Sequence, residues 1–549
     1  MKSGTSFFNG TAFRKNITRF LPVWTIYLLG CILVLTGIIS GTQPSQAQDD
    51  LEITIWIMAM VNLFYALLNA ELLFGDLFNS RLCNALHSMP LRREGWFLTN
   101  VASGLCFGLV PNLVLALCFI PRLEWYWASA FQWMLAVDLE YLFFFALAVF
   151  CVFCTGSRFA TALVYGLINF LALLMGWLVE TLYIPQLKGV MFNWELFHLF
   201  CPIVQLADIY DYFDTFESWI YLIVLAVLGV ALLAVSLQMY RKRKLECAGD
   251  FVAIKGLAPV FHVIYTLTVG TVFHLFSDIF LGSDTRIAFL MVGLVIGYFT
   301  GEMLIQRTVQ VFKLRSLAGL AILAAVLLGT MGITRLDPLG ISAWVPKAEQ
   351  VSKIELCHDV YSYYYNEPLA LTEEEIPAGL EVHRQLLDIA LDNGERDPGT
   401  TDIQVVYTLT GGRQVHREYQ IPVDSPVGNT LNDWFSAPEH VLKYEDWDAY
   451  LENLVEIRVE DKSYTGEEGR ELLMAVKADC EAGTMTQDWE FHDPKGYGNV
   501  SQYTWMSVSV DGQGHYGHIY RELVVFEDAV NTVAWLQERE TEWRYDYSK

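Results

Sequence analysis

Four carboxylates interrupt long apolar stretches of the chain: Glu71, Asp138, Glu140 and Glu302. A charged side chain inside a bilayer costs a few kcal/mol unless it is paired or faces water, so such residues are candidates for function. Asp138 and Glu140 are two positions apart, and on a helix they point roughly 200° apart. They therefore cannot form one carboxylate dyad, although either could line a substrate cavity or pair across a subunit interface. Glu71 and Glu302 lie near the ends of their apolar stretches, where snorkelling or pairing with arginines is the simpler interpretation.

The spacing of the histidines does not predict a metal site. His274 and Asp278 are four residues apart and are expected to form a hydrogen-bonded pair, with His262 in the same helical register. A proton or metal relay there is the less favoured alternative. His515 and His518 lack a third ligand nearby in the sequence and are expected to be solvated turn residues. We predict neither a metal nor another cofactor.

Eight of the ten cysteines lie in or beside apolar stretches, where a small apolar side chain is common. Cys151 and Cys154 form a CxxC pair, but an apolar run is a poor place for a metal site. Cys357 and Cys480 lie beyond the apolar stretches. They could pair in an oxidising compartment or remain free thiols, and two cysteines alone do not decide between these alternatives.

The apolar stretches are predicted to be membrane spans, because 54% of the 549 residues are hydrophobic and only 18% are charged. A span needs about 20 mostly apolar residues. The first such run is too long for the apolar core of a signal peptide, about 7 to 15 residues, so we expect it to be retained. The fold class is therefore a polytopic α-helical membrane protein with about nine spans and a C-terminal α+β soluble domain. The expected spans are 20–41, 52–73, 97–120, 130–154, 159–183, 218–239, 256–281, 287–306 and 317–333.

The charges divide the chain into a membrane domain, 1–334, and an acidic domain, 335–549. The first holds 19 Lys and Arg against 20 Asp and Glu, and the second holds 17 against 41. This acidic balance argues against a nucleic-acid partner, which requires clustered basic residues. With a cytoplasmic N-terminus, the inner connections hold 16 Lys and Arg and the outer ones 3. We therefore predict a multi-pass cell-membrane protein whose N-terminus is cytoplasmic and whose acidic domain is extracellular.

The acidic domain shows alternating patterns typical of strands. DIQVVYTLT and RQVHREYQIPV flank Gly411 and Gly412 and predict a β-hairpin, and WMSVSVDGQGHYGHIYRELVVF predicts a second one. Outside this domain, the connection 187–216 is half apolar and broken by Pro202, which predicts interfacial or re-entrant helices at the outer surface, with a simple long loop as the alternative. Helical periods in the acidic domain occur at 377–392, 466–480 and 527–538.

The connection between the second and third spans, about 76–96, contains the compact segment LHSMPLRREGW. Its composition predicts a short helix at the cytoplasmic membrane surface, with Pro90 fixing a bend and Arg92 and Arg93 in water or at phosphates. A loop that merely fixes topology is the alternative. The residues that form the core of the segment are Leu86, His87, Ser88, Met89, Pro90, Leu91, Arg92 and Arg93.

With NALHSMPLRREGWF between two spans, apolar outer helices before the sixth span, and EMLIQRTVQVFKLR before the last span, the chain resembles the permeases of type-2 ABC exporters, particularly a Gram-positive group with an extracellular domain. The resemblance covers most of the chain. It implies that the segment from Leu86 to Arg93 is a coupling helix that sits in a cleft of a separate ATPase subunit. It also implies pairing with a second copy or a related permease.

The chain itself is not expected to be an enzyme. It contains no GxxxxGK[ST] phosphate loop, no GxSxG and no HExxH. LTGGRQ at 409–414 resembles the ABC signature LSGGQ, but it occupies the predicted hairpin turn. The resemblance implies a permease that exports an amphipathic compound or peptide, that contacts membrane lipid and that is driven by a separate ABC ATPase subunit. The alternative is a membrane-anchored sensor or binding protein whose extracellular domain recognises a ligand.

Overall fold

The computed structural model contains two compact units. The first unit comprises Met1–Val179 with Asn193–Leu328, and the second comprises Glu180–Phe192 with Gly329–Lys549. A stretch of the connection after the fifth long apolar helix therefore belongs with the C-terminal region. The structure describes residues 8–39, 44–88, 92–123, 127–208, 216–243, 249–253, 255–281, 285–358, 369–389, 400–422, 425–436, 451–459, 462–482, 484–486, 503–511, 518–526 and 529–539.

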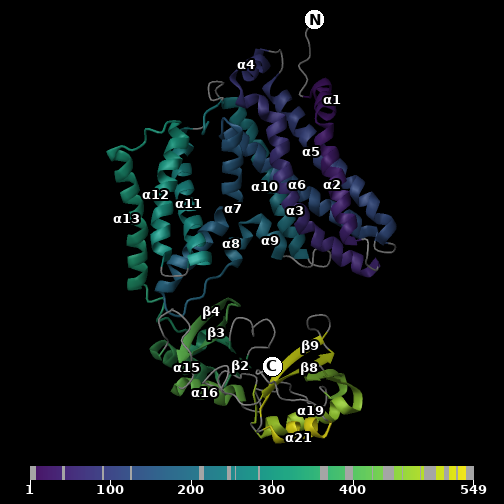
Figure 1. Ribbon diagram of the computed structural model, residues 1–549, viewed down its shortest axis with the longest axis vertical. Coiled ribbons are helices and arrows are strands. Elements are labelled where there is room, and N and C mark those ends of the chain that lie inside the picture. The colour runs from purple at the N-terminus through teal and green to yellow at the C-terminus, as the bar shows by residue number, and fades with distance from the viewer. Residues whose placement is uncertain are drawn as a thin grey trace. The chain divides into compact units, whose positions relative to one another are not determined.

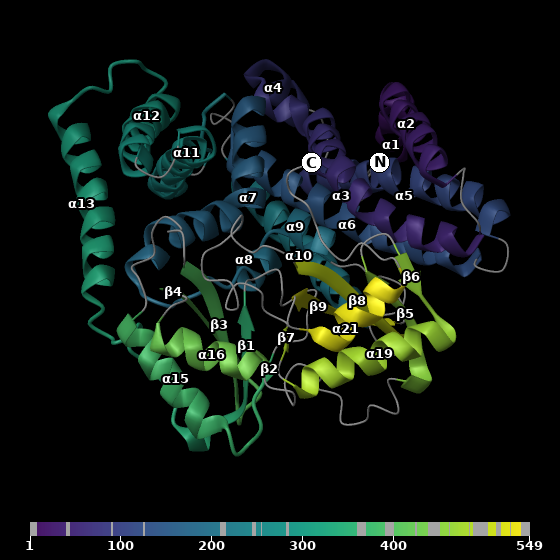
Figure 2. The same cartoon turned by 60° about the horizontal axis from the view of Figure 1, so that its bottom comes forward.

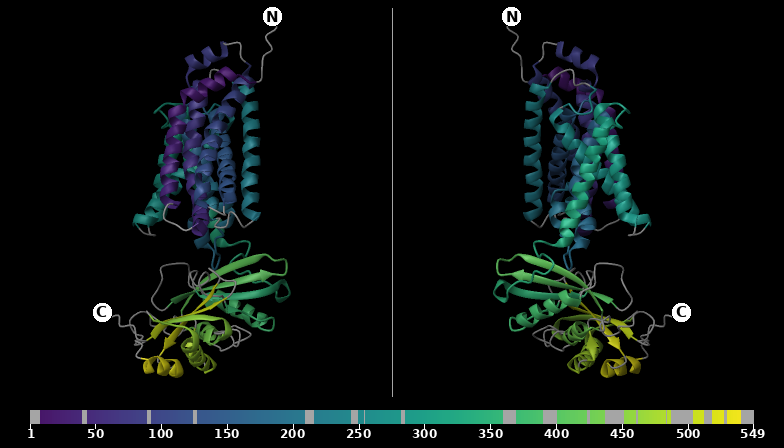
Figure 3. Two further views of the ribbon diagram at one scale, coloured as in Figure 1. Left: turned by 90° about the vertical axis from the view of Figure 1, so that its right-hand side faces the viewer. Right: turned by 90° about the vertical axis from the view of Figure 1, so that its left-hand side faces the viewer.

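The first unit is made of helices, and its long helices run roughly parallel to one another (Figure 1, Figure 3). Within the described ranges, nine helices are long and apolar enough to cross a membrane, at the nine expected places. The helices up to residue 336 are α1 (Gly10–Arg19), α2 (Leu21–Ile39), α3 (Pro44–Phe74), α4 (Ser80–Ser88), α5 (Arg93–Leu123), α6 (Trp127–Cys154), α7 (Arg158–Leu182), α8 (Glu195–Leu199), α9 (Pro202–Asp208), α10 (Phe216–Lys242), α11 (Ala258–Leu281), α12 (Arg286–Gln306) and α13 (Leu314–Leu336), with short 3₁₀ turns η1 (Gly75–Phe78), η3 (Ile184–Gln186) and η5 (Lys255–Leu257).

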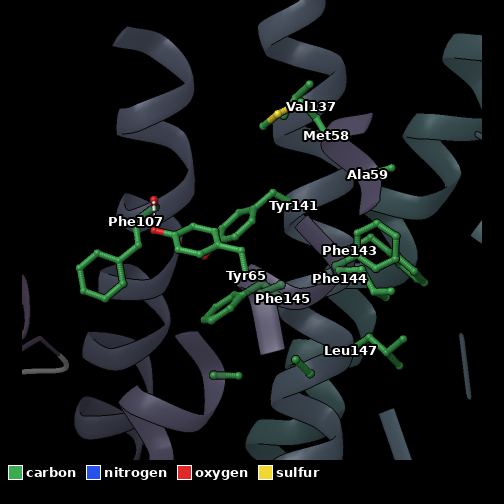
Figure 4. Packing of buried hydrophobic residues seen from close by; sticks show 14 of the residues in the cluster. Met58, Ala59, Tyr65, Phe107, Val137, Tyr141, Phe143, Phe144, Phe145 and Leu147 are labelled. Carbon is green, nitrogen blue, oxygen red and sulfur yellow. Dashed lines mark hydrogen bonds between the residues drawn. The ribbon is translucent and has the colours of Figure 1, made fainter. Parts of the chain in front are cut away.

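Helix α6 is the core of the first unit and packs against α3, α5 and α10. Its run FFFALAVF is apolar on every side, as expected for a helix that is buried all round. Gly108 on α5 lets the two helices approach closely, because a Cβ at this position would lie 2.3 Å from the ring of Tyr141. Figure 4 shows the aromatic side chains in this interface, where the Tyr65 hydroxyl donates to the carbonyl of Phe107 at 2.9 Å.

Helices α11 and α12 form a tight pair along a glycine seam. A Cβ on Gly293 would lie 2.7 Å from Phe273 and 2.9 Å from Gly270. Small residues of this kind allow two apolar helices to pack backbone to backbone. Helix α13 is different, because only Ser316 is buried along its length.

The second unit contains two antiparallel sheets, each with a hydrophobic core of its own. The two expected hairpins are confirmed as β3 with β4 and β8 with β9. Figure 2 shows α15 and α16 along one face of the first sheet, and α19 and α21 along one face of the second. The elements are η7 (Ala348–Gln350), β1 (Val351–His358), β2 (Leu369–Ala370), α15 (Ile376–Ile389), β3 (Thr400–Leu409), β4 (Gln414–Pro422), α16 (Pro426–Ser436), β5 (Leu454–Val459), β6 (Lys462–Tyr464), α19 (Gly466–Glu481), β7 (Met485–Thr486), β8 (Tyr503–Asp511), β9 (His518–Phe526) and α21 (Val530–Glu538).

The two sheets repeat one topology, which the sequence analysis did not detect. Each begins with a strand and a short antiparallel partner, continues with a helix and a hairpin, and ends with a second helix. The strand orders are β2-β1-β3-β4 and β6-β5-β8-β9-β7, so the second differs only by the added edge strand. A glycine lies at the same place in both first helices: Gly379 faces Leu371, and Gly469 faces the carbonyl of Tyr464.

The first sheet is extended by residues 187–192, here called the strap, from the connection between α7 and α8. Val190 forms an antiparallel bridge with Arg417 on the edge of β4 that does not pair with β3. In the second sheet, β7 pairs with the corresponding edge of β9. Gly189 has a φ of +65°, and a Cβ there would lie 2.1 Å from the ring of Tyr419. The strap thus contains a turn at 188–189 followed by the bridge at Val190, and the helices expected within 187–216 are α8 and α9.

Candidate functional site

The expected coupling segment contains the short helix α4, which follows α3 and η1. Asn79 caps it, since its Oδ1 accepts the backbone N–H groups of Arg81 at 3.0 Å and Leu82 at 3.4 Å. Cys83 is buried, whereas Leu82 is 50% exposed. Helix α4 therefore presents an apolar side chain to its surroundings. The residues outside the described part are Met89, Pro90 and Leu91, together with the side chains of Leu86 and His87.

Arg93 follows α4 and caps a different helix. Its Nη1 lies 3.4 Å from the carbonyl of Tyr240, 3.3 Å from that of Arg241 and 3.4 Å from that of Arg243. These carbonyls lie at the C-terminal end of α10, where a helix leaves its last acceptors unsatisfied and a cation is favourable. Arg93 is thus partly exposed and caps α10, a contact that the sequence analysis did not predict, whereas Arg92 is exposed.

Arg243 forms the same kind of contact with α6. Its two Nη atoms donate to the carbonyls of Val152 and Thr155, both at 2.9 Å, and its guanidinium lies over the ring of Phe153. Arg241 pairs with Glu94, the second residue of α5, at 3.1 Å. The ends of α5, α6 and α10 next to the coupling segment are thus connected by arginines.

Asp138 lies at one end of a chain of hydrogen bonds between helices. Asn112 donates its Nδ2 to Asp138 at 2.8 Å, and its Oδ1 accepts the hydroxyl of Tyr27 at 3.0 Å. The same hydroxyl lies 3.3 Å from Oδ1 of Asn62. This series of hydrogen bonds joins α6, α5, α2 and α3. The asparagines within the apolar stretches could have indicated this series of hydrogen bonds, but the sequence analysis considered only the carboxylates.

Glu140 is fully buried, and neither of its carboxylate oxygens has a hydrogen-bond partner among the described residues. It lies beside Asn62 of α3. Charging this group would be costly, since nothing within the described part of the chain compensates a negative charge there.

The other two carboxylates lie at helix ends. Glu302 accepts hydrogen bonds from Gln306 at 2.7 Å and from Ser316 at 2.9 Å, so it joins α12 to α13. Glu71 has the Arg158 guanidinium as a charged neighbour, and its Oε1 is buried without a hydrogen-bond partner among the described residues. Glu71 and Glu302 therefore have partners of their own, whereas Asp138 and Glu140 both lie along the series of hydrogen bonds that includes Asn62.

No family model, curated protein or solved structure matches the chain. Within the described residues, no group of His, Cys, Asp and Glu side chains is suited to hold a metal ion.

His262 and His274 both contact backbone. Their ring nitrogens lie 2.8 Å from the carbonyl of Tyr298 and 3.2 Å from that of Arg286. The side chain of Asp278, His515 and the side chain of His518 lie outside the described part.

Cys357 and Cys480 are free thiols. Cys357 lies on β1 of the first sheet and Cys480 on α19 beside the second. Burial raises the pKa of the Cys357 thiol to about 12, which makes it unreactive at neutral pH.

Proposed function

We propose that the chain is the membrane-spanning permease subunit of an ATP-driven transporter of the type-2 ABC class, and that it exports an amphipathic compound or peptide. It pairs with a second permease, and a separate ATPase subunit binds at α4. The N-terminus and α4 are cytoplasmic, and the C-terminal region is outside the cell. The nine membrane-length helices and the distribution of Lys and Arg along the chain support this assignment.

The observation that carries the proposal is the way the coupling segment is held. The chain itself connects it to α3 and α5, and Arg93 connects it to the end of α10. Arg243, next to that end, holds the end of α6. A push on α4 therefore acts on four helices at once, which is the requirement for converting the closure of ATPase domains into movement of helices.

The same geometry gives the arginines a mechanical role. A guanidinium that binds several helix-terminal carbonyls makes charge-assisted hydrogen bonds, which are stronger than those between neutral groups. Movement of the coupling segment is then transmitted through these bonds rather than lost in a flexible loop. Since the chain has no phosphate loop, the energy comes from the partner ATPase.

Cross-linking tests this assignment. The chain is copurified with any ATPase encoded next to its gene, after Leu82→Cys on α4 or, as a control, Leu196→Cys on α8. Leu196 is 59% exposed, and α8 lies at the other end of the first unit from α4 (Figure 1). We expect a short bifunctional thiol reagent to join the ATPase to Leu82→Cys, above the background of the native cysteines, and not to Leu196→Cys. Copurification of no ATPase would reject the proposal in favour of the sensor, and equal cross-linking at both positions would reject the role of α4.

A further inference from the structure

Arg417 on β4 is a buried cation with too few acceptors. The residue is 4% exposed, and its Nη2 donates to the carbonyl of Ile341 at 2.8 Å. Its Nε and Nη1 are buried and have no hydrogen-bond partner among the described residues. Its guanidinium lies over the ring of Trp344 at 5.7 Å. Burying a charged group without its hydrogen bonds is expensive, so a native protein is expected to supply a counterpart.

Asp337 is an acidic group on which Arg417 acts, and its carboxylate is already hydrogen-bonded. Its two carboxylate oxygens accept the backbone N–H groups of Ile341 and Ser342, both at 2.8 Å. Although slight burial opposes the effect, these hydrogen bonds lower the pKa of Asp337, and Arg417 adds to it. Asp337 thus stabilises its own loop, and no ion pair with Arg417 is found in the described part of the unit.

The second sheet shows that the fold does not need this cation. In the first sheet, Tyr407 of β3 pairs with Ile354 of β1, and in the second sheet, Val508 of β8 pairs with Ile457 of β5. Tyr407 and Val508 therefore occupy equivalent positions in the two repeats. Two residues before each of these positions, Val405 pairs with Arg417 and Met506 pairs with Leu523. Leu523 therefore stands where the first sheet has Arg417.

The polar groups around Arg417 are replaced in the same way. By the strand pairing, Tyr419 corresponds to Val525. His383 lies four residues after Gly379, as Leu473 lies four residues after Gly469. In the first repeat, the two ring nitrogens of His383 form hydrogen bonds with the hydroxyl of Tyr407 at 2.6 Å and with that of Tyr419 at 2.5 Å. The positions occupied by an arginine, a histidine and two tyrosines in the first repeat hold Leu523, Leu473, Val508 and Val525 in the second.

We propose that Arg417 binds an oxyanion, a carboxylate or phosphate group, in the first of the two repeats. The planar guanidinium matches such groups with two parallel hydrogen bonds, and its Nε and Nη1 supply the unused donors. Trp344 and the strap border the site, since Trp344 lies beneath the guanidinium and Val190 pairs with Arg417 itself. The hydrogen bonds of His383 fix the Tyr419 ring, on which Gly189 of the strap rests. This site belongs to the second unit and does not rest on the proposed transport function.

Calorimetric titration of the purified full-length chain tests the site. Acetate and inorganic phosphate are the probes, and chloride at equal ionic strength is the reference. Arg417→Leu installs the residue found at the equivalent position of the second repeat, and Arg384→Leu is the control, because Arg384 has an exposed side chain paired with Glu381. We expect saturable binding of at least one oxyanion by the wild type and by Arg384→Leu, and an affinity at least about tenfold lower for Arg417→Leu.

Two results would overturn the proposal: no saturable oxyanion binding by the wild-type chain, or equal binding by Arg417→Leu. If Arg417→Leu does not fold, Arg417→Lys replaces it. Lysine keeps the charge but lacks the planar pair of donors, so we expect it to bind at least about threefold more weakly than arginine. Unchanged binding by Arg417→Lys would then reject the guanidinium as the ligand.

Discussion

Glu140 is a carboxyl group without a charged partner among the residues that the structure describes. Both carboxylate oxygens are buried, and Asn62 of α3 lies beside them. Glu140→Gln has nearly the same shape and no charge, so we expect the thermal stability of the purified chain to change by less than about 1 kcal/mol. Glu140→Lys should prevent accumulation of folded protein in the membrane. If Glu140→Gln lost as much folded protein from the membrane as Glu140→Lys, the fold would require the ionised form of Glu140.

His383 gives the second unit a pH dependence. Burial, assisted by Arg417 and Arg384, lowers the pKa of His383 to about 4. In the unfolded chain the pKa is about 6.5, so between these values the unfolded state binds the extra proton. Stability should therefore fall as the pH falls from about 6.5 to about 4, by up to about 3 kcal/mol, and His383 should contribute nothing further outside this window.

Thermal unfolding of the wild type and of His383→Leu, measured across this pH range, isolates the effect from that of the many carboxylates. His383→Leu removes the hydrogen bonds to both tyrosines, so its stability should be lower at pH 7. The difference between the two proteins should then shrink as the pH falls to 4. A constant difference would contradict the account of His383.

At the scale of elements, the strap is the least expected part of the fold. Gly189 combines a positive φ with a close approach to the Tyr419 ring, so any side chain there is strained. We expect Gly189→Val to release the strap and to speed hydrogen exchange at the amide of Glu418, which donates to the Gly189 carbonyl at 3.3 Å. Gly166→Val on α7 is the matched control, because a Cβ there meets nothing within 4 Å. Equal exchange in both variants would show that the strap does not hold the sheet edge.

Local patterns predicted the elements well and their long-range partners poorly. The nine long helices and both hairpins were predicted, because apolar length and strand alternation are visible in short windows. The pairing of Val190 with Arg417 and the capping of α10 by Arg93 join residues far apart in the chain, and no local pattern marks them. The repeat was also missed, because the two copies share topology and a glycine position but little sequence.

At the scale of the whole molecule, we propose that the helices of this chain move while a separate ATPase subunit supplies the energy. The coupling segment is fixed to the ends of four helices, and the chain has no nucleotide-binding loop of its own. The four carboxylates considered as candidate sites have different contacts: Asp138 accepts a hydrogen bond from Asn112, and Glu302 accepts hydrogen bonds from Gln306 and Ser316. The proposed function therefore depends on the coupling of these helices to the ATPase subunit.

Hydrolysis of ATP by the copurified complex in lipid vesicles tests this coupling most directly. The chain alone should show no hydrolysis, and the complex should hydrolyse ATP. Leu82→Glu, which replaces the exposed leucine of α4 with a charged residue, should lower that rate by about tenfold without removing the chain from the membrane, whereas Leu196→Glu on α8 should leave it unchanged. Hydrolysis by the chain alone, or a rate unaffected by Leu82→Glu, would contradict the assignment of this protein as a permease driven through α4.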